Sequence, residues 1–210
     1  MKVVGLFGSP RRGGNTDLLL EEALKGAEKE RAEVERIYLS DFHIIPCTEC
    51  LNCYEKGECI ILDDMQKIYP KLLEADAILL ASPIFFYGVT AWVKGLIDRC
   101  QALWSRKYVL KDPSLGKEGK KRKGFFISVG ATKGQKIFEG AILTARYFFD
   151  VLNAEYAGDL LIKGVDVGGD ILKQPEVLKQ AFEAGGKLVR NAREGNEDAK
   201  RTVGKSEKVG

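Results

Sequence analysis

The segment Lys2–Gly8 (KVVGLFG) is a short apolar run, rich in β-branched residues, that ends in turn residues. Such a run is typical of a buried strand. The loop 8–16 (GSPRRGGNT) follows it, and leucines at helical spacing then predict a helix from Asn15 to about Arg31, with Asn15 as its N-cap. A strand that leads through a short loop into a helix is the building unit of parallel α/β sheets.

The same unit recurs along the whole chain. Further strands are predicted over residues 33–39, 76–82, 124–129 and 154–162, and further helices over 62–75, 90–103, 136–152 and 175–192. We expect Asp63 or Asp64 to cap the predicted helix 62–75, and Pro70 to kink or shorten it. This alternation implies right-handed crossovers and a parallel sheet that is covered on both faces. The polar run 193–210 shows no periodicity and is predicted to be a mobile tail, which leaves 1–192 as one domain.

Composition and charge narrow the class of protein. The N-terminal apolar run is too short for a signal peptide, and no run approaches the roughly 20 apolar residues that span a bilayer. We therefore expect a cytoplasmic protein without a membrane partner. A net charge of +3 gives no support for nucleic-acid binding. The segment from Arg106 to Lys123, however, contains eight Lys or Arg and only two acidic residues. This excess of positive charge indicates either a solvated loop or a docking patch for an acidic partner.

Four of the five cysteines lie within thirteen residues, in the segment Cys47–Cys59 (CTECLNCYEKGEC). In a reducing compartment, clustered thiols favour metal or redox chemistry over disulfides. The spacing C-x2-C-x2-C-x5-C is comparable to the run with which bacterial-type ferredoxins bind a [4Fe–4S] cluster. It predicts Cys47, Cys50, Cys53 and Cys59 as cluster ligands. Structural zinc, which prefers two separated pairs, and redox-active or incidental thiols are the alternatives.

The loop 8–16 offers what a phosphate group needs. Ser9, Asn15 and Thr16 supply short hydrogen-bond donors, Gly13 and Gly14 permit close approach of the backbone, and Arg11 or Arg12 supplies charge. The alternative is a plain glycine-rich turn, because the loop matches neither GxGxxG nor the P-loop pattern. Two more loops, 82–90 (SPIFFYGVT) and 129–135 (VGATKGQ), follow strands at the same edge and suit a flat heterocycle such as a flavin.

Two single residues, Cys100 and His43, have simpler interpretations. Cys100, within the predicted helix 90–103, is expected to be a buried structural thiol. His43 is the only histidine and is expected in a loop, which makes a Ser-His-Asp triad improbable.

Together, the loops, the cysteine block 47–65 and the segment 75–99 (ADAILLASPIFFYGVTAWVKGLIDR) resemble the iron–sulfur flavoproteins. These belong to the flavodoxin-like NAD(P)H-dependent FMN reductase superfamily, and the resemblance runs from Met1 to about Leu152. It implies a three-layer α/β sandwich with a five-stranded parallel sheet in the order 2-1-3-4-5 and a cysteine-rich insertion after strand 2. It also implies a homodimer or homotetramer with the flavin near a subunit boundary.

The resemblance assigns residues to FMN. Ser9, Arg11, Asn15 and Thr16, with Gly13, would bind the phosphate. The ribityl chain and the ring would be lined by two further groups of residues, namely Pro83, Ile84, Phe85, Phe86, Tyr87 and Gly88, and Gly130, Ala131, Thr132 and Gly134. The implied function is electron transfer between a one-electron donor such as ferredoxin and an acceptor, through a [4Fe–4S] cluster and FMN. The alternatives are an NAD(P)H-dependent FMN or quinone reductase without a cluster, and a zinc-stabilised module without catalytic activity.

Overall fold

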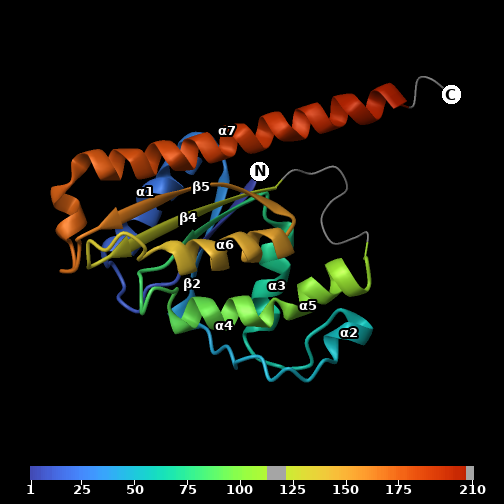
Figure 1. Cartoon of the computed structure of the whole chain (residues 1–210). Helices are drawn as coiled ribbons and strands as arrows, with labels where there is room; N and C mark the ends of the chain where they lie inside the picture. Colours follow the sequence, from blue (N-terminus) through green and yellow to red (C-terminus); the bar gives the residue numbers. More distant parts are fainter. Residues whose placement is uncertain (113–121, 207–210) are drawn as a thin grey trace.

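Five parallel strands form the centre of the molecule (Figure 1). The structure, a computed structural model, describes residues 1–112 and 122–206. The strands are β1 (Lys2–Phe7), β2 (Glu33–Tyr38), β3 (Ala77–Ala81), β4 (Arg122–Gly130) and β5 (Ala154–Lys163). They are ordered β2-β1-β3-β4-β5, and every neighbouring pair is parallel. This confirms the predicted flavodoxin-like sheet.

Helices cover both faces of this sheet (Figure 1). The helices are α1 (Asn15–Lys29), α2 (Cys53–Lys56), α3 (Met65–Glu74), α4 (Ala91–Arg99), α5 (Gln101–Trp104), α6 (Glu139–Val151) and α7 (Pro175–Ser206). Successive side chains of β1 point to opposite faces of the sheet. Val3 and Phe7 pack in the core under α1 and α7. Val4 and Leu6 pack in the core under α3, α4 and α6. All four side chains are buried, which explains why the strand is apolar without interruption.

Three predicted helices differ in detail from the structure. Gly14, not Asn15, takes the cap position of α1, because the Asn15 side chain is used elsewhere. The helix α3 contains Pro70 and continues to Glu74, so Pro70 does not shorten it as one of the two expected effects required. The predicted helix 90–103 is divided at Cys100 into α4 and α5 and continues as a π-helical turn over Ser105–Val109.

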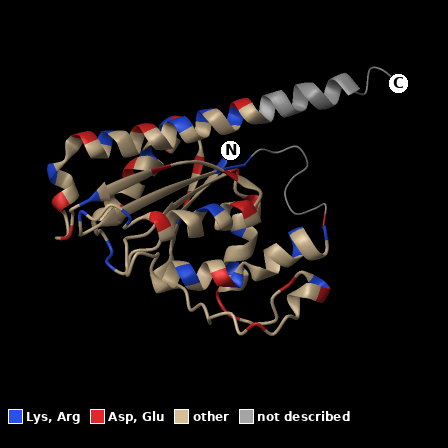
Figure 2. Ribbon diagram, viewed as in Figure 1, with Lys and Arg blue, Asp and Glu red and all other residues tan. Residues whose placement is uncertain are grey.

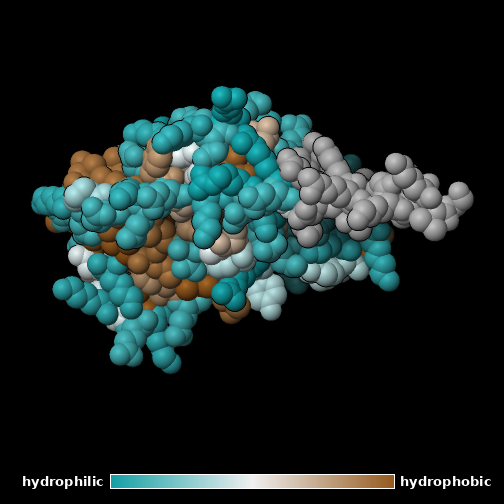
Figure 3. All heavy atoms as spheres, turned by 90° about the horizontal axis from the view of Figure 1, so that it is seen from above, coloured by the Kyte–Doolittle hydropathy of each residue, from teal (hydrophilic) through white to brown (hydrophobic). Residues whose placement is uncertain are grey.

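The last helix, α7, is longer than predicted. Residues 193–206, which we expected to belong to a mobile tail, continue its backbone from Ala192 to Ser206. Extending an existing helix needs no new nucleation, so the polar run 193–206 can remain helical without an apolar stripe. The first part of α7 packs closely on α1: a Cβ at Gly26 would lie 1.9 Å from the carbonyl oxygen of Phe182. Seen from above, the surface is mainly hydrophilic, and its apolar residues gather towards the end opposite the grey atoms (Figure 3).

Charged residues of both signs are interspersed over α4 and α7 (Figure 2). The described part of the basic segment is largely paired. Arg106 binds Asp112 at 2.8 Å, Lys107 binds Asp150 at 3.0 Å, and Lys123 binds Glu155 at 2.7 Å. The remaining basic residues of the segment, apart from Lys111 and Arg122, lie outside the described ranges. Among the helices that the structure describes, none is long and apolar enough to cross a bilayer.

Candidate functional site

The cysteine segment lies between β2 and α3, and its four thiols line one cavity of about 420 Å³. The other walls come from α4, α5 and α6 and include Arg99, Trp104 and Tyr147. Cys47 and Cys50 are exposed, whereas Cys53 and Cys59 are half-buried, and all four are free thiols. The structure therefore brings the four predicted ligands to one cavity.

The backbone of the segment curls so that each cysteine can reach this cavity. Glu49 and Leu51 adopt left-handed conformations, with φ of 53° and 60°. Cys53 begins the single helical turn α2, and Gly57 ends it with φ of 69°. A larger residue does not fit at position 57, because a Cβ there would lie 2.4 Å from Arg106 Cγ. Left-handed residues other than glycine are strained and are concentrated at functional sites.

The thiols share the cavity without converging on one point. In residues 1–112 and 122–206, no group of three or more His, Cys, Asp or Glu side chains is close enough to hold a metal ion. The donor set suits an iron–sulfur cluster in kind and number, because four thiolates are its usual ligands. The side chains would have to turn inward from the cavity wall to bind it.

Cys100 also borders this cavity, but as a buried residue with 2% exposure. Burial raises the pKa of its thiol to about 12, so the thiol stays protonated at neutral pH. This confirms the expected buried thiol. His43 is exposed in the loop before the cysteine segment, as predicted.

A second cavity, of about 110 Å³, lies at the carboxyl ends of the strands. It is lined by residues of four loops, which are Ser9, Pro10, Arg11, Gly14, Asn15 and Thr16, then Pro83, Ile84 and Phe85, then Val129 and Ala131, and last Val165, Asp166 and Gly168. Eight of the predicted FMN-binding residues are among them. The other seven, Gly13, Phe86, Tyr87, Gly88, Gly130, Thr132 and Gly134, are not part of its lining.

The first loop presents unused donors to this cavity. The backbone N–H groups of Asn15 and Thr16 have no acceptor in the described chain, as expected for the first turn of a helix. The Thr16 hydroxyl makes no hydrogen bond to a described residue either, although Thr16 is 2% exposed. Ser9 shapes the turn instead, because its hydroxyl accepts from Arg11 N at 3.1 Å and donates to Arg11 O.

The two arginines of the loop differ in their contacts. Arg12 forms an ion pair with Asp41 and stacks over the Tyr38 ring, 3.9 Å from its centroid. Arg11 is exposed, and its side chain has no ion-pair partner among the residues described. The sequence left the choice between them open, and the structure leaves Arg11 free to bind an anion.

Asp17 is a buried acidic residue that follows these donors in the first turn of α1. It is 3% exposed, and its Oδ2 accepts a hydrogen bond from Gly13 N at 3.0 Å, while its Oδ1 has no partner in the described part of the chain. Burial raises the pKa of this carboxyl to about 6. Asp17 therefore holds the loop and at the same time competes with an incoming anion.

The second loop ends in an exposed aromatic hairpin. Phe85 and Gly88 exchange backbone hydrogen bonds of 3.0 and 2.9 Å around Phe86 and Tyr87. Both of these have positive φ, 48° and 63°, and their side chains are exposed. A turn of this type favours glycine or asparagine, so two adjacent aromatic residues there store strain. The hairpin thus exposes three aromatic side chains, of which Phe85 lines the cavity.

Sequence reasoning missed the loop that follows β5. Asn15 fixes this loop, because its Nδ2 donates to Val167 O at 2.9 Å and its Oδ1 accepts from Ile171 N at 3.2 Å. The Asn15 side chain thus supports the site rather than facing the cavity with free donors. The sequence did carry a signal, since Gly168, Gly169 and Asp170 are turn residues that follow a strand of the same parallel sheet.

Comparisons with known proteins agree with this geometry. A family model described as NADPH-dependent FMN reductase matches residues 1–142. An iron–sulfur flavoprotein of Methanocaldococcus jannaschii is 39% identical over 161 residues, which cover 76% of this chain and 77% of that protein. A putative NAD(P)H-dependent FMN-containing oxidoreductase of Bacillus subtilis is 29% identical over 86% of this chain and 94% of its own. The solved structure of a flavone reductase superposes with a TM-score of 0.67 at 25% identity, over 92% of this chain and 63% of that one.

Proposed function

The chain belongs to the NADPH-dependent FMN reductase family, and within it to the iron–sulfur flavoproteins, and we propose that it transfers electrons through a [4Fe–4S] cluster and FMN. The protein is an FMN-dependent oxidoreductase. The donor in this proposal is a one-electron carrier such as ferredoxin. When bound, a cluster exchanges single electrons and FMN accepts one or two, so the oxidation of two reduced donor molecules would supply one two-electron reduction of the acceptor.

The observation that carries the proposal is that the four thiols line one cavity, apart from the cavity of the phosphate loop. Cys47, Cys50, Cys53 and Cys59 would be the ligands. The left-handed residues Glu49 and Leu51 support the proposal, because strain of this kind persists where function requires a particular backbone path.

The second cavity supports FMN through the chemistry of its lining. The N–H groups at the start of α1 and the hydroxyl of Thr16 would bind the phosphate, and Arg11 would neutralise it. Gly14 permits the tight turn of this loop, because a Cβ at this position would lie 3.0 Å from Arg11 O. The hairpin Phe85–Gly88 would border the ring and would exclude water from one side of it.

Ferredoxin, or another acidic carrier, remains a proposal on weaker grounds. The described basic residues Arg106, Lys107 and Lys123 are paired with carboxylates, so they support a docking patch less than the sequence suggested. A homodimer or homotetramer is also proposed, since the exposed Phe86, Leu143 and Tyr147 would gain from burial at an interface. Light scattering of the purified protein tests this, and a monomeric mass would contradict it.

Donor assays test the function. Protein purified without oxygen should show rapid bleaching of its flavin absorbance when reduced ferredoxin is added, and little when NAD(P)H is added. Fast reduction by NAD(P)H together with none by ferredoxin would overturn the proposed donor.

A second candidate is an NAD(P)H-dependent FMN or quinone reductase without a cluster. One observation favours it: in the part of the chain that the structure describes, the thiols are not close enough to one another to hold a metal ion. Iron analysis separates the two candidates, because this reductase would contain FMN and no iron.

A further inference from the structure

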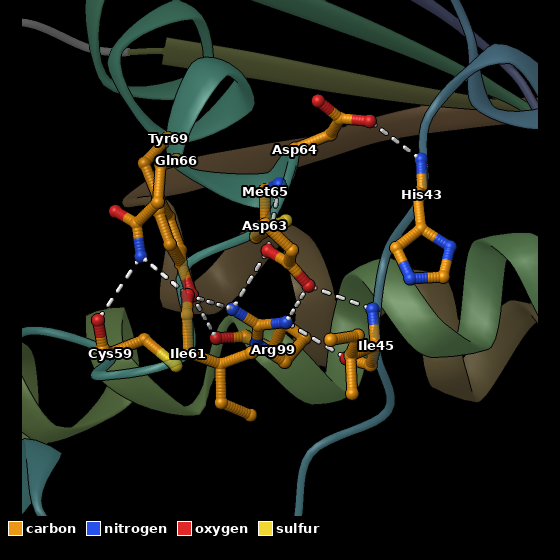
Figure 4. Close-up of polar contacts among 10 residues, drawn as sticks. All are labelled: His43, Ile45, Cys59, Ile61, Asp63, Asp64, Met65, Gln66, Tyr69 and Arg99. Atoms are coloured by element: carbon orange, nitrogen blue, oxygen red, sulfur yellow. Dashed lines mark hydrogen bonds and ion pairs between the residues drawn. The ribbon is translucent and has the colours of Figure 1, made fainter.

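A buried ion pair closes the cysteine segment at its base (Figure 4). The side chains of Asp63 and Arg99 are 1% and 0% exposed, so neither charge reaches water. A buried pair is tolerated only where further hydrogen bonds satisfy both partners. The proposed function uses neither residue, and the sequence indicated only a helix cap for Asp63.

Arg99 joins the two ends of the segment. Its Nη1 donates to Ile45 O at 2.8 Å, two residues before the first cysteine, and its Nη2 donates to Ile61 O at 3.2 Å, two residues after the last. Asp63 completes the closure, because its Oδ2 accepts from Ile45 N at 2.7 Å and its Oδ1 from Met65 N at 3.0 Å. One guanidinium thus holds both ends against α4 (Figure 4).

Two residues of α3 reinforce this closure next to the fourth cysteine. Gln66 Nε2 donates to the carbonyl oxygens of Cys59, at 3.1 Å, and Ile61, at 3.0 Å. The Tyr69 hydroxyl donates to Arg99 O at 2.6 Å. Arg99, Asp63, Gln66 and Tyr69 form what we call the clasp.

Arg99 has one donor left over. Its Nε–H is buried and has no acceptor among the described residues, although Arg99 borders the cavity of the four thiols. A buried donor without a partner is destabilising, so such groups call for an explanation. The Cys59 side chain lies close enough to the guanidinium for the two to interact electrostatically. A sulfur atom bound in the cavity would satisfy this donor.

We propose that Arg99 is a positioning residue, which holds both ends of the cysteine segment over the thiol cavity and directs its spare N–H and positive charge towards the sulfur atoms bound there. This inference rests on the proposed function. A cluster bound there would gain one negative charge on accepting an electron from the donor, which would be oxidised. A fixed cation and a hydrogen bond to sulfur stabilise this added charge and raise the reduction potential.

Three variants separate the two roles of Arg99. Arg99→Lys keeps the charge but cannot bridge two carbonyls and a carboxylate, since it lacks the planar fork. Arg99→Gln removes the charge as well. The double variant, Asp63→Asn with Arg99→Gln, removes both charges, so neither is left buried without its partner. Arg36→Gln is the matched control, because Arg36 pairs with Glu21 and Glu28 at 3.0 Å on β2.

Amide hydrogen exchange of residues 45–61 and EPR redox titration of the anaerobic holoprotein are the measurements. Arg99→Lys should exchange these amides about tenfold faster with a nearly unchanged midpoint potential. Arg99→Gln and the double variant should show the same faster exchange and a midpoint about 60 mV lower, which is tenfold in the reduction equilibrium. The control should match the wild type in both, and all variants should retain FMN.

The inference would be overturned if Arg99→Gln and the double variant had the same amide exchange rates and the same midpoint potential as the wild type. Its failure is distinguishable from failure of the proposed function. Iron-free wild-type protein would refute the function. Iron-containing protein whose amide exchange and midpoint potential do not change with these substitutions would refute only the role of Arg99.

Discussion

Thr90 and Arg99 mark the two ends of α4, and each ties the helix to a different candidate site. The Thr90 hydroxyl donates to Gly8 O at 2.7 Å, where the phosphate loop begins. Arg99 binds Ile45 and Ile61 at either end of the cysteine segment. Nine residues of helix separate them by about 13 Å. One rigid element therefore fixes the distance between the elements of the two sites, and transfer of electrons between two cofactors requires such a fixed distance.

Replacing Arg11 should weaken FMN binding. Arg11→Ala is expected to lose about 1–3 kcal/mol, because it removes a charged hydrogen bond to the phosphate. Arg12→Ala is the matched control and should cost much less affinity, since Arg12 is held by Asp41 and Tyr38. Fluorescence titration of flavin-free protein with FMN measures both. A larger loss from Arg12→Ala would reassign the phosphate contact.

Replacing one clustered cysteine should remove iron and leave the flavin in place. Cys50→Ala is expected to lose the cluster, whereas FMN is retained because its cavity is built from other loops. Cys100→Ala serves as the control and should keep iron, since Cys100 is a buried neutral thiol. Iron and flavin contents per chain are measured. Loss of FMN from Cys50→Ala would show that the two sites depend on each other structurally.

Two glycines in helices should respond to alanine in opposite directions. Gly26→Ala is expected to destabilise the fold by about 3 kcal/mol, because its Cβ would lie 1.9 Å from Phe182 O and would push α7 away from α1. Gly95→Ala should stabilise the fold by about 0.5–1 kcal/mol, since no atom lies within 4 Å of its Cβ in α4. Urea unfolding gives both values. Equal stability of the two variants would contradict the close crossing of α1 and α7.

Asp17 should make stability fall as pH rises through the mildly acidic range. Its pKa is about 6 in the folded chain and 3.8 is the ordinary value, so the folded state binds the proton more tightly. The unfolding free energy therefore decreases between about pH 4 and 6. Asp17→Asn does not titrate and should be more stable at pH 7 to 8 by about 1–2 kcal/mol.

Urea unfolding across this pH range measures the effect. Asp98→Asn is the control, because Asp98 pairs with Lys94 on the surface at 2.7 Å. The same substitution at Asp17 should also tighten FMN, since it removes a negative charge beside the phosphate donors. Parallel pH curves for the wild type and Asp17→Asn would contradict the raised pKa.

The fold was largely predictable because local signals agreed with one another. The apolar runs that became β1 and β3 are buried on both faces, so they carry the pattern of parallel strands directly. Helix ends were less accurate. Asn15 was expected to cap its own helix, but a loop 152 residues away recruits its side chain, and sequence spacing alone does not show such a partner.

The candidate site was predictable where residues are close together in the sequence. The four cysteines and the phosphate loop are local motifs, and the structure brings each to one cavity. The clasp was not predictable, because Asp63 and Arg99 lie 36 residues apart and meet only after α3 and α4 pack on the sheet. The loop after β5 was missed for the same reason, since only the sheet brings it next to Ser9.

The most direct measurement is the iron, acid-labile sulfide and FMN content of protein purified without oxygen, with EPR after reduction. We predict about four iron and four sulfide per chain, with one FMN and a cluster signal on reduction. Zinc in place of iron, or FMN with no metal at all, would contradict the account.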